Sequence, residues 1–157
     1  GHIKISKEAK KKFCLNKVFW VITKKNPFKK RPLFNLNKRM NKCKNLIQKY
    51  SKIKVKYLDN KIRSSKTIQV IRYLKKINRD SKIIFILGSD NLINFNKWEK
   101  WKEITKLADL AILSRQGFDN RAKKSIAAGF LKKKNIIFVN NKKINISSSN
   151  LRKNYLK

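Results

Sequence analysis

The chain has 157 residues, of which 43 are Lys or Arg and only 8 are Asp or Glu, giving a formal net charge of +35. This length suits one ordinary domain spanning residues 1–157, and no linker interrupts it. Such a charge ordinarily points to nucleic acid or an acidic membrane. The lysines, however, are spread over nearly every segment and accompany abundant Asn and Ile, a mixture expected of an adenine- and thymine-rich coding sequence. The charge therefore leaves two interpretations open, compositional bias and a selected polyanion-binding surface.

Residue counts exclude several kinds of site. His2 is the only histidine, which excludes multi-histidine metal sites and two-histidine proton relays. The eight acids are scattered, which argues against a hydrolase with paired carboxylates. Cys14 and Cys43 form no close pair, so we expect reduced, half-buried core thiols and no disulfide or zinc site. Because no run approaches the ~20 apolar residues of a membrane span, we expect a soluble, cytoplasmic protein without a membrane partner.

Short β-branched apolar runs alternate with amphipathic segments along the chain. We expect strands at Val18–Thr23, Ile53–Leu58, Ile83–Leu87, Asp109–Ser114 and Ile136–Val139. We expect helices at Ile3–Phe13, Leu36–Tyr50, Thr67–Ile77 and Trp98–Leu107. Residues 119–133 stay ambiguous because Gly129 interrupts a helical pattern. This alternation predicts right-handed crossovers and a mostly parallel sheet in a doubly wound α/β domain.

The segment 85–92, Phe-Ile-Leu-Gly-Ser-Asp-Asn-Leu, followed by a tryptophan-bearing segment to residue 101, carries the most information about function. It predicts a buried strand that stops on a glycine and a polar pair, the place where open α/β sheets bind ligands. Asp90 is placed to accept hydrogen bonds from ribose hydroxyls or to cap the following helix, and these two roles are compatible. Trp98 and Trp101 would share one helix face, and core packing is the ordinary explanation for such a pair.

Three further motifs stand at other points of the chain. They are Gly1-His2 at the start, Asn26-Pro27-Phe28-Lys29 after an apolar run, and Ile146-Ser147-Ser148-Ser149-Asn150-Leu151-Arg152 near the end. Together with the 85–101 block, and in this order, they resemble the nicotinate-nucleotide adenylyltransferase family over essentially the whole chain. The 85–101 block is fairly specific for this family, whereas the serine-rich motif is shared by sibling nucleotidyltransferases.

The resemblance implies a Rossmann-like fold and adenylyl transfer from ATP to nicotinate mononucleotide, which yields nicotinate adenine dinucleotide and pyrophosphate in NAD biosynthesis. Mg²⁺ would enter with ATP and not in a dedicated protein cage. A phosphate monoester is already anionic, so the protein mainly aligns the reactants and neutralises charge. The two expected partners are thus ATP and nicotinate mononucleotide.

The resemblance also implies roles for residues near the start of the chain. His2, with Gly1 before it, matches a histidine that contacts the ATP phosphates and stabilises transition-state charge; the alternative is a solvated terminal histidine. Lys29 matches a lysine near the substrate phosphates, with a solvated turn as the alternative. Arg39 is a weaker phosphate candidate.

Near the other end, Ser147, Ser148 and Arg152 match the family's ATP-phosphate motif. Free N–H groups, hydroxyls and a guanidinium at the start of a short helix form an anion-binding cradle, although one serine also has to cap that helix. The expected catalytic residues are His2, Lys29 and Arg152.

The remaining expected contacts concern the two nucleosides. Gly88 and Asp90 would line the ATP nucleoside pocket, and Trp98 matches the residue that stacks on the nicotinate ring, while Trp101 resembles core. Relatives have the motif Tyr-Thr-x-Asp-Thr where this chain has Lys-Thr-Ile-Gln-Val at residues 66–70. Thr67 matches the first threonine of the motif, but the chain lacks its tyrosine and its aspartate. Thr67 is therefore either a substrate contact or only a helix cap.

Two expectations concern the chain as a whole. The family signature Gly-x-Phe-x-Pro-x-His-x-Gly-His is represented only by its last Gly-His, so we expect the domain to lack its first strand and the sequence to be truncated at its N-terminus. The alternatives to the proposed activity are another nucleotidyltransferase, such as phosphopantetheine adenylyltransferase, and a basic nucleic-acid-binding protein, although a recognised aromatic–basic module is missing.

Overall fold

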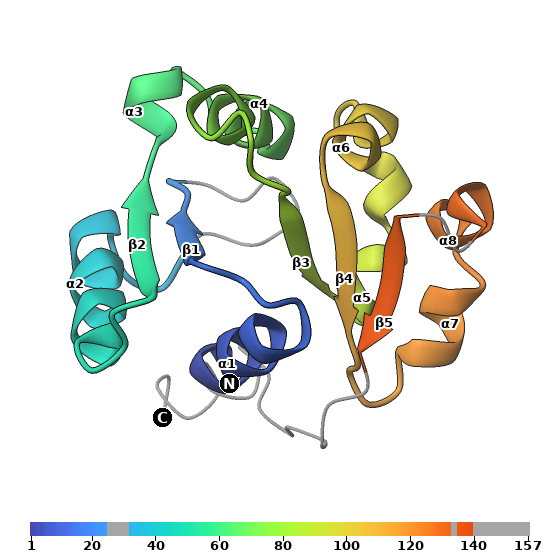
Figure 1. Ribbon diagram of the computed structural model, residues 1–157, viewed down its shortest axis with the longest axis horizontal. Helices are drawn as coiled ribbons and strands as arrows, with labels where there is room; N and C mark the ends of the chain where they lie inside the picture. Colours follow the sequence, from blue (N-terminus) through green and yellow to red (C-terminus); the bar gives the residue numbers. More distant parts are fainter. Residues whose placement is uncertain (25–31, 133–134, 140–157) are drawn as a thin grey trace. The chain divides into compact units, whose positions relative to one another are not determined.

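A computed structural model describes residues 1–24, 32–132 and 135–139 and divides the chain into two compact units. Of the described residues, the first unit contains 1–24 and 32–65, and the second contains 66–132 and 135–139. Both units are α/β, and all the strand pairs that the structure describes are parallel, which confirms the predicted fold class (Figure 1). The extent of the domain, residues 1–157, stays a prediction.

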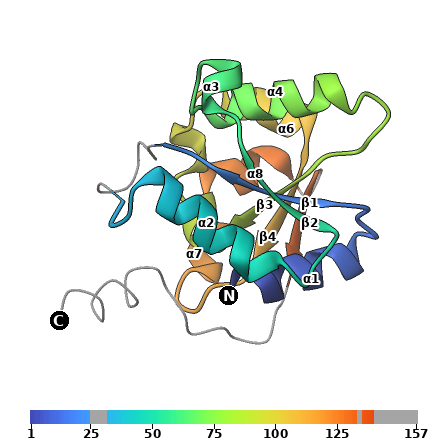
Figure 2. The ribbon, with the colours of Figure 1, turned by 90° about the vertical axis from the view of Figure 1, so that its left-hand side faces the viewer.

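The first unit contains a two-stranded sheet with helices. Its elements are α1 (His2–Lys12), β1 (Val18–Ile22), α2 (Leu36–Ile47), β2 (Ile53–Tyr57) and α3 (Asp59–Ile62). Val18 pairs with Ile53 and Ile22 with Tyr57, so β1 and β2 end at the same edge. The crossover helix α2 packs along both strands (Figure 2). It starts where the Asn35 side chain accepts a hydrogen bond from the Lys38 N–H at 2.9 Å, an ordinary N-cap.

Two side chains fix the backbone where β1 ends. Arg39 donates from its two terminal nitrogens to the carbonyls of Thr23 and Lys24, at 2.9 and 3.2 Å. Asp59, which is 8% exposed, accepts the Lys24 N–H at 2.8 Å. Arg39, expected as a phosphate candidate, therefore holds the protein's own main chain in this structure.

The second unit contains a three-stranded sheet in the order β3-β4-β5. Its elements are α4 (Thr67–Ile77), β3 (Ile84–Gly88), α5 (Ser89–Leu92), the 3₁₀ turn η1 (Phe95–Lys97), α6 (Trp101–Leu107), β4 (Asp109–Leu113), α7 (Asp119–Lys123), α8 (Ile126–Leu131) and β5 (Ile136–Val139). Gly88 pairs with Leu113, and Leu113 with Val139. All three strands therefore end at one edge, from which α5 and α7 start.

The core of the second unit lies around β4. Four consecutive residues of this strand, Leu110 to Leu113, are at most 2% exposed, as expected for a central parallel strand covered on both faces. Fully buried side chains from α4, α5, η1 and α6 pack in the same cluster, namely Ile68, Leu92, Phe95 and Ile104. A bidentate ion pair between Arg72 of α4 and Glu103 of α6, at 2.6 and 2.7 Å, joins the two helices at the surface.

Most predicted elements agree with the structure within a few residues, but one helix start is wrong. We expected a helix from Trp98, whereas α6 begins at Trp101. Lys100 has a left-handed backbone with φ of 50°, and Trp98 closes the 3₁₀ turn by donating its N–H to the Phe95 carbonyl at 3.0 Å. The ambiguous segment 119–133 contains two short helices, α7 and α8.

Left-handed backbone occurs mostly at residues other than glycine. Among the described residues, Gly117 is the only glycine with positive φ, and the others with positive φ are Cys14, Arg63, Lys100, Lys132 and Asn135. Cys14 is exposed, so its prediction as a core thiol is wrong, whereas Cys43 is half-buried as expected. Burial raises the pKa of the Cys43 thiol, an effect that the nearby Arg39 charge partly offsets. None of the described helices has the length and apolar composition to span a bilayer.

Candidate active site

Polar side chains gather where β3 and β4 end. Gly88 is the last residue of β3, and Ser89 and Asp90 open α5 directly after it. Ser89 is fully buried, and the Asp90 side chain is 22% exposed. Arg115 follows β4 by two residues, and Asp119 opens α7. The edge at which parallel strands end is the usual ligand-binding edge of such sheets.

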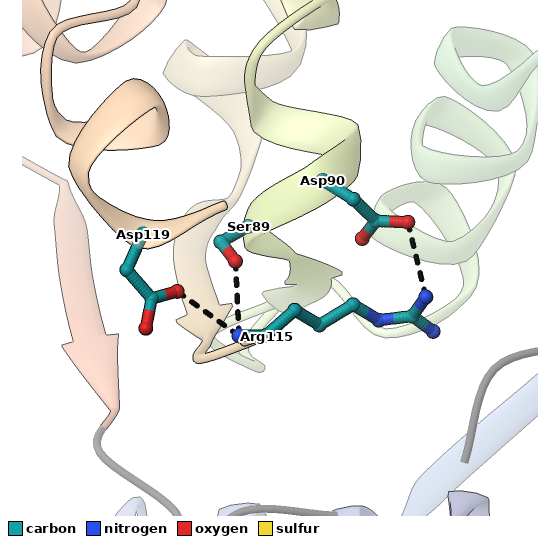
Figure 3. Close-up of polar contacts among 4 residues, drawn as sticks. All are labelled: Ser89, Asp90, Arg115 and Asp119. Carbon is teal, nitrogen blue, oxygen red and sulfur yellow. Dashed lines mark hydrogen bonds and ion pairs between the residues drawn. The ribbon is translucent and has the colours of Figure 1, made fainter. Parts of the chain in front are cut away.

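Arg115 connects these side chains, as Figure 3 shows. Its backbone N–H donates both to the Ser89 hydroxyl and to Asp119 Oδ1, each at 3.0 Å. Its guanidinium reaches the other way and pairs with Asp90 Oδ2 at 3.1 Å. The second oxygen, Asp90 Oδ1, is buried and has no hydrogen-bond partner among the described residues. An unsatisfied buried carboxylate oxygen is costly, so a ligand hydroxyl that reached it would be stabilised there.

The Asp119 carboxylate is held in its charged form. Partial burial raises its pKa. The Ser114 and Ser89 hydroxyls, the Arg115 N–H and the Lys123 charge together lower the pKa by more than burial raises it, so the pKa of Asp119 lies below its usual value. The bond from the Ser114 hydroxyl to Asp119 Oδ2 is short. Asp119 is thus an anionic acceptor at neutral pH.

The space beside Gly88 is occupied by the side chains of two neighbours. A Cβ at this position would overlap Asp90 Oδ1 and lie 3.2 Å from Arg115 Nε. The Asp90 and Arg115 side chains therefore lie directly against Gly88 at the end of β3, and any side chain at this position would have to displace them.

Trp98 packs beside β3. Its ring meets Phe85 of β3 edge-on, with centroids 6.1 Å apart, and lies 5.4 Å from the buried ring of Phe95. Trp101 contacts Phe95 from another direction at 6.1 Å, and also Phe130 at 5.0 Å. The two tryptophans therefore share Phe95 as a neighbour although they do not share a helix, and both are partly buried.

Sequence comparisons agree with one another on the family. A family model described as cytidylyltransferase-like matches residues 1–154. A protein of Pelagibacter ubique named as a probable nicotinate-nucleotide adenylyltransferase is 46% identical over 98% of this chain and 84% of its own length. A protein of Cereibacter sphaeroides with the same name is 31% identical over 82% of this chain and 67% of its own length. The chain belongs to the nicotinate-nucleotide adenylyltransferase family.

A solved structure is similar in fold. The Plasmodium falciparum nicotinic acid mononucleotide adenylyltransferase complexed with NaAD superposes with a TM-score of 0.74, covering 97% of this chain and 75% of its own, at 22% identity. At this identity the likeness shows the fold, and it agrees with the predicted Rossmann-like nucleotidyltransferase class.

The structure places some of the residues expected from the family motifs together. Gly88 and Asp90 adjoin each other in the second unit, and their role in lining a nucleoside pocket stays a prediction. Thr67 and Trp98 also lie in the second unit. Their sequence neighbours, Lys66 and Glu99, form an ion pair at 2.5 Å. Gly1 and His2 lie in the first unit: Gly1 is the N-cap of α1, and the exposed His2 ring meets Trp20 edge-on at 5.8 Å.

Helix capping, the alternative role considered for Asp90 and for Thr67, does not occur at either residue. Asp90 is the second residue of α5, whose N-cap is Gly88, and Thr67 is the first residue of α4, whose N-cap is Lys66. Neither helix has a side-chain cap hydrogen bond. The expected phosphate-binding residues Lys29, Ser147, Ser148 and Arg152 lie outside the described residues.

Sequence reasoning missed Ser89, Ser114, Arg115 and Asp119. The available signal was Ser114-Arg115-x-Gly117 directly after a predicted strand, because polar residues at a strand's carboxyl end belong to the ligand-binding edge. The pairing of Arg115 with Asp90, 25 residues earlier, has no local sequence signature.

Proposed function

We propose that this chain catalyses adenylyl transfer from ATP to nicotinate mononucleotide, giving nicotinate adenine dinucleotide and pyrophosphate. The observation that carries the proposal is the end of β3, where Asp90, lying against Gly88, keeps one carboxylate oxygen without a hydrogen-bond partner among the described residues. The 46% identity to a relative named for this activity supports it. Asp90 would accept hydrogen bonds from ribose hydroxyls of ATP.

The reaction needs charge neutralisation more than proton transfer. A phosphate oxygen of nicotinate mononucleotide forms a bond to the α-phosphorus of ATP, and the bond to the β-phosphate oxygen breaks, so pyrophosphate leaves. We assign contacts with ATP phosphates to His2, with Gly1, and to Ser147, Ser148 and Arg152. We assign Lys29 to the substrate phosphates. Each of these groups would lower the barrier by stabilising negative charge.

The nicotinate end of the acceptor is assigned to Trp98, with Thr67 nearby. A ring face against a flat heterocycle contributes on the order of 1 kcal/mol beyond its buried area, which orients the ligand. Mg²⁺ would enter bound to the phosphates of ATP. Residues 1–24, 32–132 and 135–139 include no group of three or more His, Cys, Asp or Glu that could hold a metal, so we assign the ion no protein ligand.

The experiment uses protein expressed from its complete gene. Pyrophosphate release and nicotinate adenine dinucleotide formation are followed with ATP, Mg²⁺ and nicotinate mononucleotide, and parallel reactions replace the acceptor with nicotinamide mononucleotide or phosphopantetheine. We expect the nicotinate acceptor to give the highest kcat/KM. Turnover of phosphopantetheine alone would favour the sibling enzyme. Absence of turnover together with tight, salt-sensitive DNA binding would favour a nucleic-acid-binding protein.

A further inference from the structure

Asp119 is the residue on which the hydrogen bonds at the ends of β3 and β4 converge. Its carboxylate accepts from the Arg115 N–H at 3.0 Å and from the Ser114 hydroxyl in a short bond. Both donors lie outside α7, the helix that Asp119 opens. The carboxylate therefore joins α7 to the loop after β4, and the Arg115 N–H, which Ser89 also accepts, connects this loop to the start of α5 after β3.

The consequence for Arg115 is a main chain fixed from two sides. Its single N–H is shared between Asp119 and Ser89, a fully buried residue on α5. A fixed Cα limits where the long side chain can place its guanidinium. That group then meets Asp90 Oδ2 at 3.1 Å, while Nε lies close to the position of a Cβ on Gly88.

The contact between Arg115 and Asp90 is weak without this support. The two side chains are 38% and 22% exposed, and partly exposed ion pairs contribute little to stability because solvent competes with them. Such a pair does not hold a flexible arginine in place on its own. The fixed main chain at Arg115 supplies the constraint that the ion pair lacks.

We propose that Asp119 is a positioning residue for ATP binding, which acts through Arg115: it fixes the Arg115 backbone so that the guanidinium holds one oxygen of Asp90 and orients the other toward the ATP ribose. This inference rests on the proposed function, in which Asp90 binds the ribose. Asp119 itself touches neither ligand in this scheme. Its effect should therefore depend on the presence of the Arg115 side chain.

The test is a double-mutant cycle on protein expressed from its complete gene. The variants are Asp119→Ala, Arg115→Gln and the double variant, and the measurements are the KM for ATP, the KM for nicotinate mononucleotide and the dissociation constant of ATP by calorimetry. We expect Asp119→Ala to raise the KM and the dissociation constant for ATP about tenfold, with the KM for nicotinate mononucleotide changed less than about twofold. In the Arg115→Gln background, Asp119→Ala should add less than about twofold.

Two further variants separate positioning from stability. Asp119→Asn keeps an oxygen acceptor for the Arg115 N–H and should recover most of the ATP affinity that Asp119→Ala loses. Asp109→Ala is the matched control. The Asp109 side chain is 17% exposed and pairs with Lys82, and Asp109 is the first residue of β4, at the end of the strand away from Arg115. Asp109→Ala should leave the KM for ATP unchanged.

The outcomes distinguish this inference from the proposed function. A wild-type protein that binds ATP but does not use nicotinate mononucleotide would contradict the proposed function, and the cycle would still be decided by ATP dissociation constants. Independent effects of the two substitutions, or equal losses for both substrates, would overturn the positioning role. Wild-type protein without ATP affinity would overturn both.

Discussion

Gly88→Ala should disturb the Asp90–Arg115 contact directly, because the added methyl would occupy the space of their side chains. The Cβ would overlap Asp90 Oδ1 and lie 3.2 Å from Arg115 Nε, so the carboxylate and the guanidinium must both move. Overpacking of this kind costs about 1–3 kcal/mol, while losing the half-exposed ion pair costs about 0–1 kcal/mol. We expect the free energy of unfolding to fall by about 1–3 kcal/mol, mostly from the overlap.

Urea unfolding and the KM for ATP measure the two parts of this prediction. Gly129→Ala in α8 is the matched control, because a Cβ there meets nothing within 4 Å and a helix interior favours Ala over Gly by roughly 0.5–1 kcal/mol. The control should therefore be more stable than wild type, with an unchanged KM for ATP. If Gly88→Ala unfolds at the same urea concentration as wild type and binds ATP equally well, the Asp90 carboxylate does not lie against Gly88 as described.

Three further predictions follow from other contacts. Trp98→Ala should weaken nicotinate mononucleotide binding by about 1–3 kcal/mol while calorimetry finds ATP affinity nearly unchanged, and equal losses would instead indicate a collapsed core. Because hydrogen bonds lower the folded-state pKa of Asp119, its stabilisation is complete above the unfolded value of about 3.9 and is lost as pH falls through the folded pKa. The stability difference between wild type and Asp119→Asn, measured by urea unfolding, should thus be constant near neutral pH and vanish in acid. Arg39→Ala should reduce the free energy of unfolding by about 1–3 kcal/mol, since two backbone carbonyls at the end of β1 lose a charged donor; a change below about 0.5 kcal/mol would contradict these bonds.

The strands were predictable because their signal is local. Runs such as Ile83–Leu87 and Ile136–Val139 combine β-branched residues with polar boundaries, and both occur as strands within one residue of the prediction. The amphipathic repeat of α4 likewise predicted its bounds, Thr67–Ile77. Each of these segments is stabilised by burying its apolar face, whichever part of the chain packs against that face. The spacing of apolar residues alone therefore predicts the strand or helix.

The start of α6 was not predictable for a physical reason. Trp98 and Trp101 have helical spacing, but Lys100 between them takes a left-handed backbone, which lysine does not signal. The candidate site shows the same limit at longer range. Gly88 and Asp90 were identified from their place after a strand, whereas the Arg115 partner depends on β3 and β4 lying side by side, a fact of tertiary structure.

The left-handed residues bear on how this fold could be stabilised. The chain has only four glycines among its 157 residues, and Arg63 and Lys132 take left-handed conformations directly after α3 and α8, where glycine is the usual choice. A side chain in this conformation costs roughly 1 kcal/mol or more relative to glycine. A composition poor in glycine and rich in lysine thus leaves backbone strain at helix ends. Substituting glycine for Arg63 or Lys132 should remove this strain and raise the free energy of unfolding.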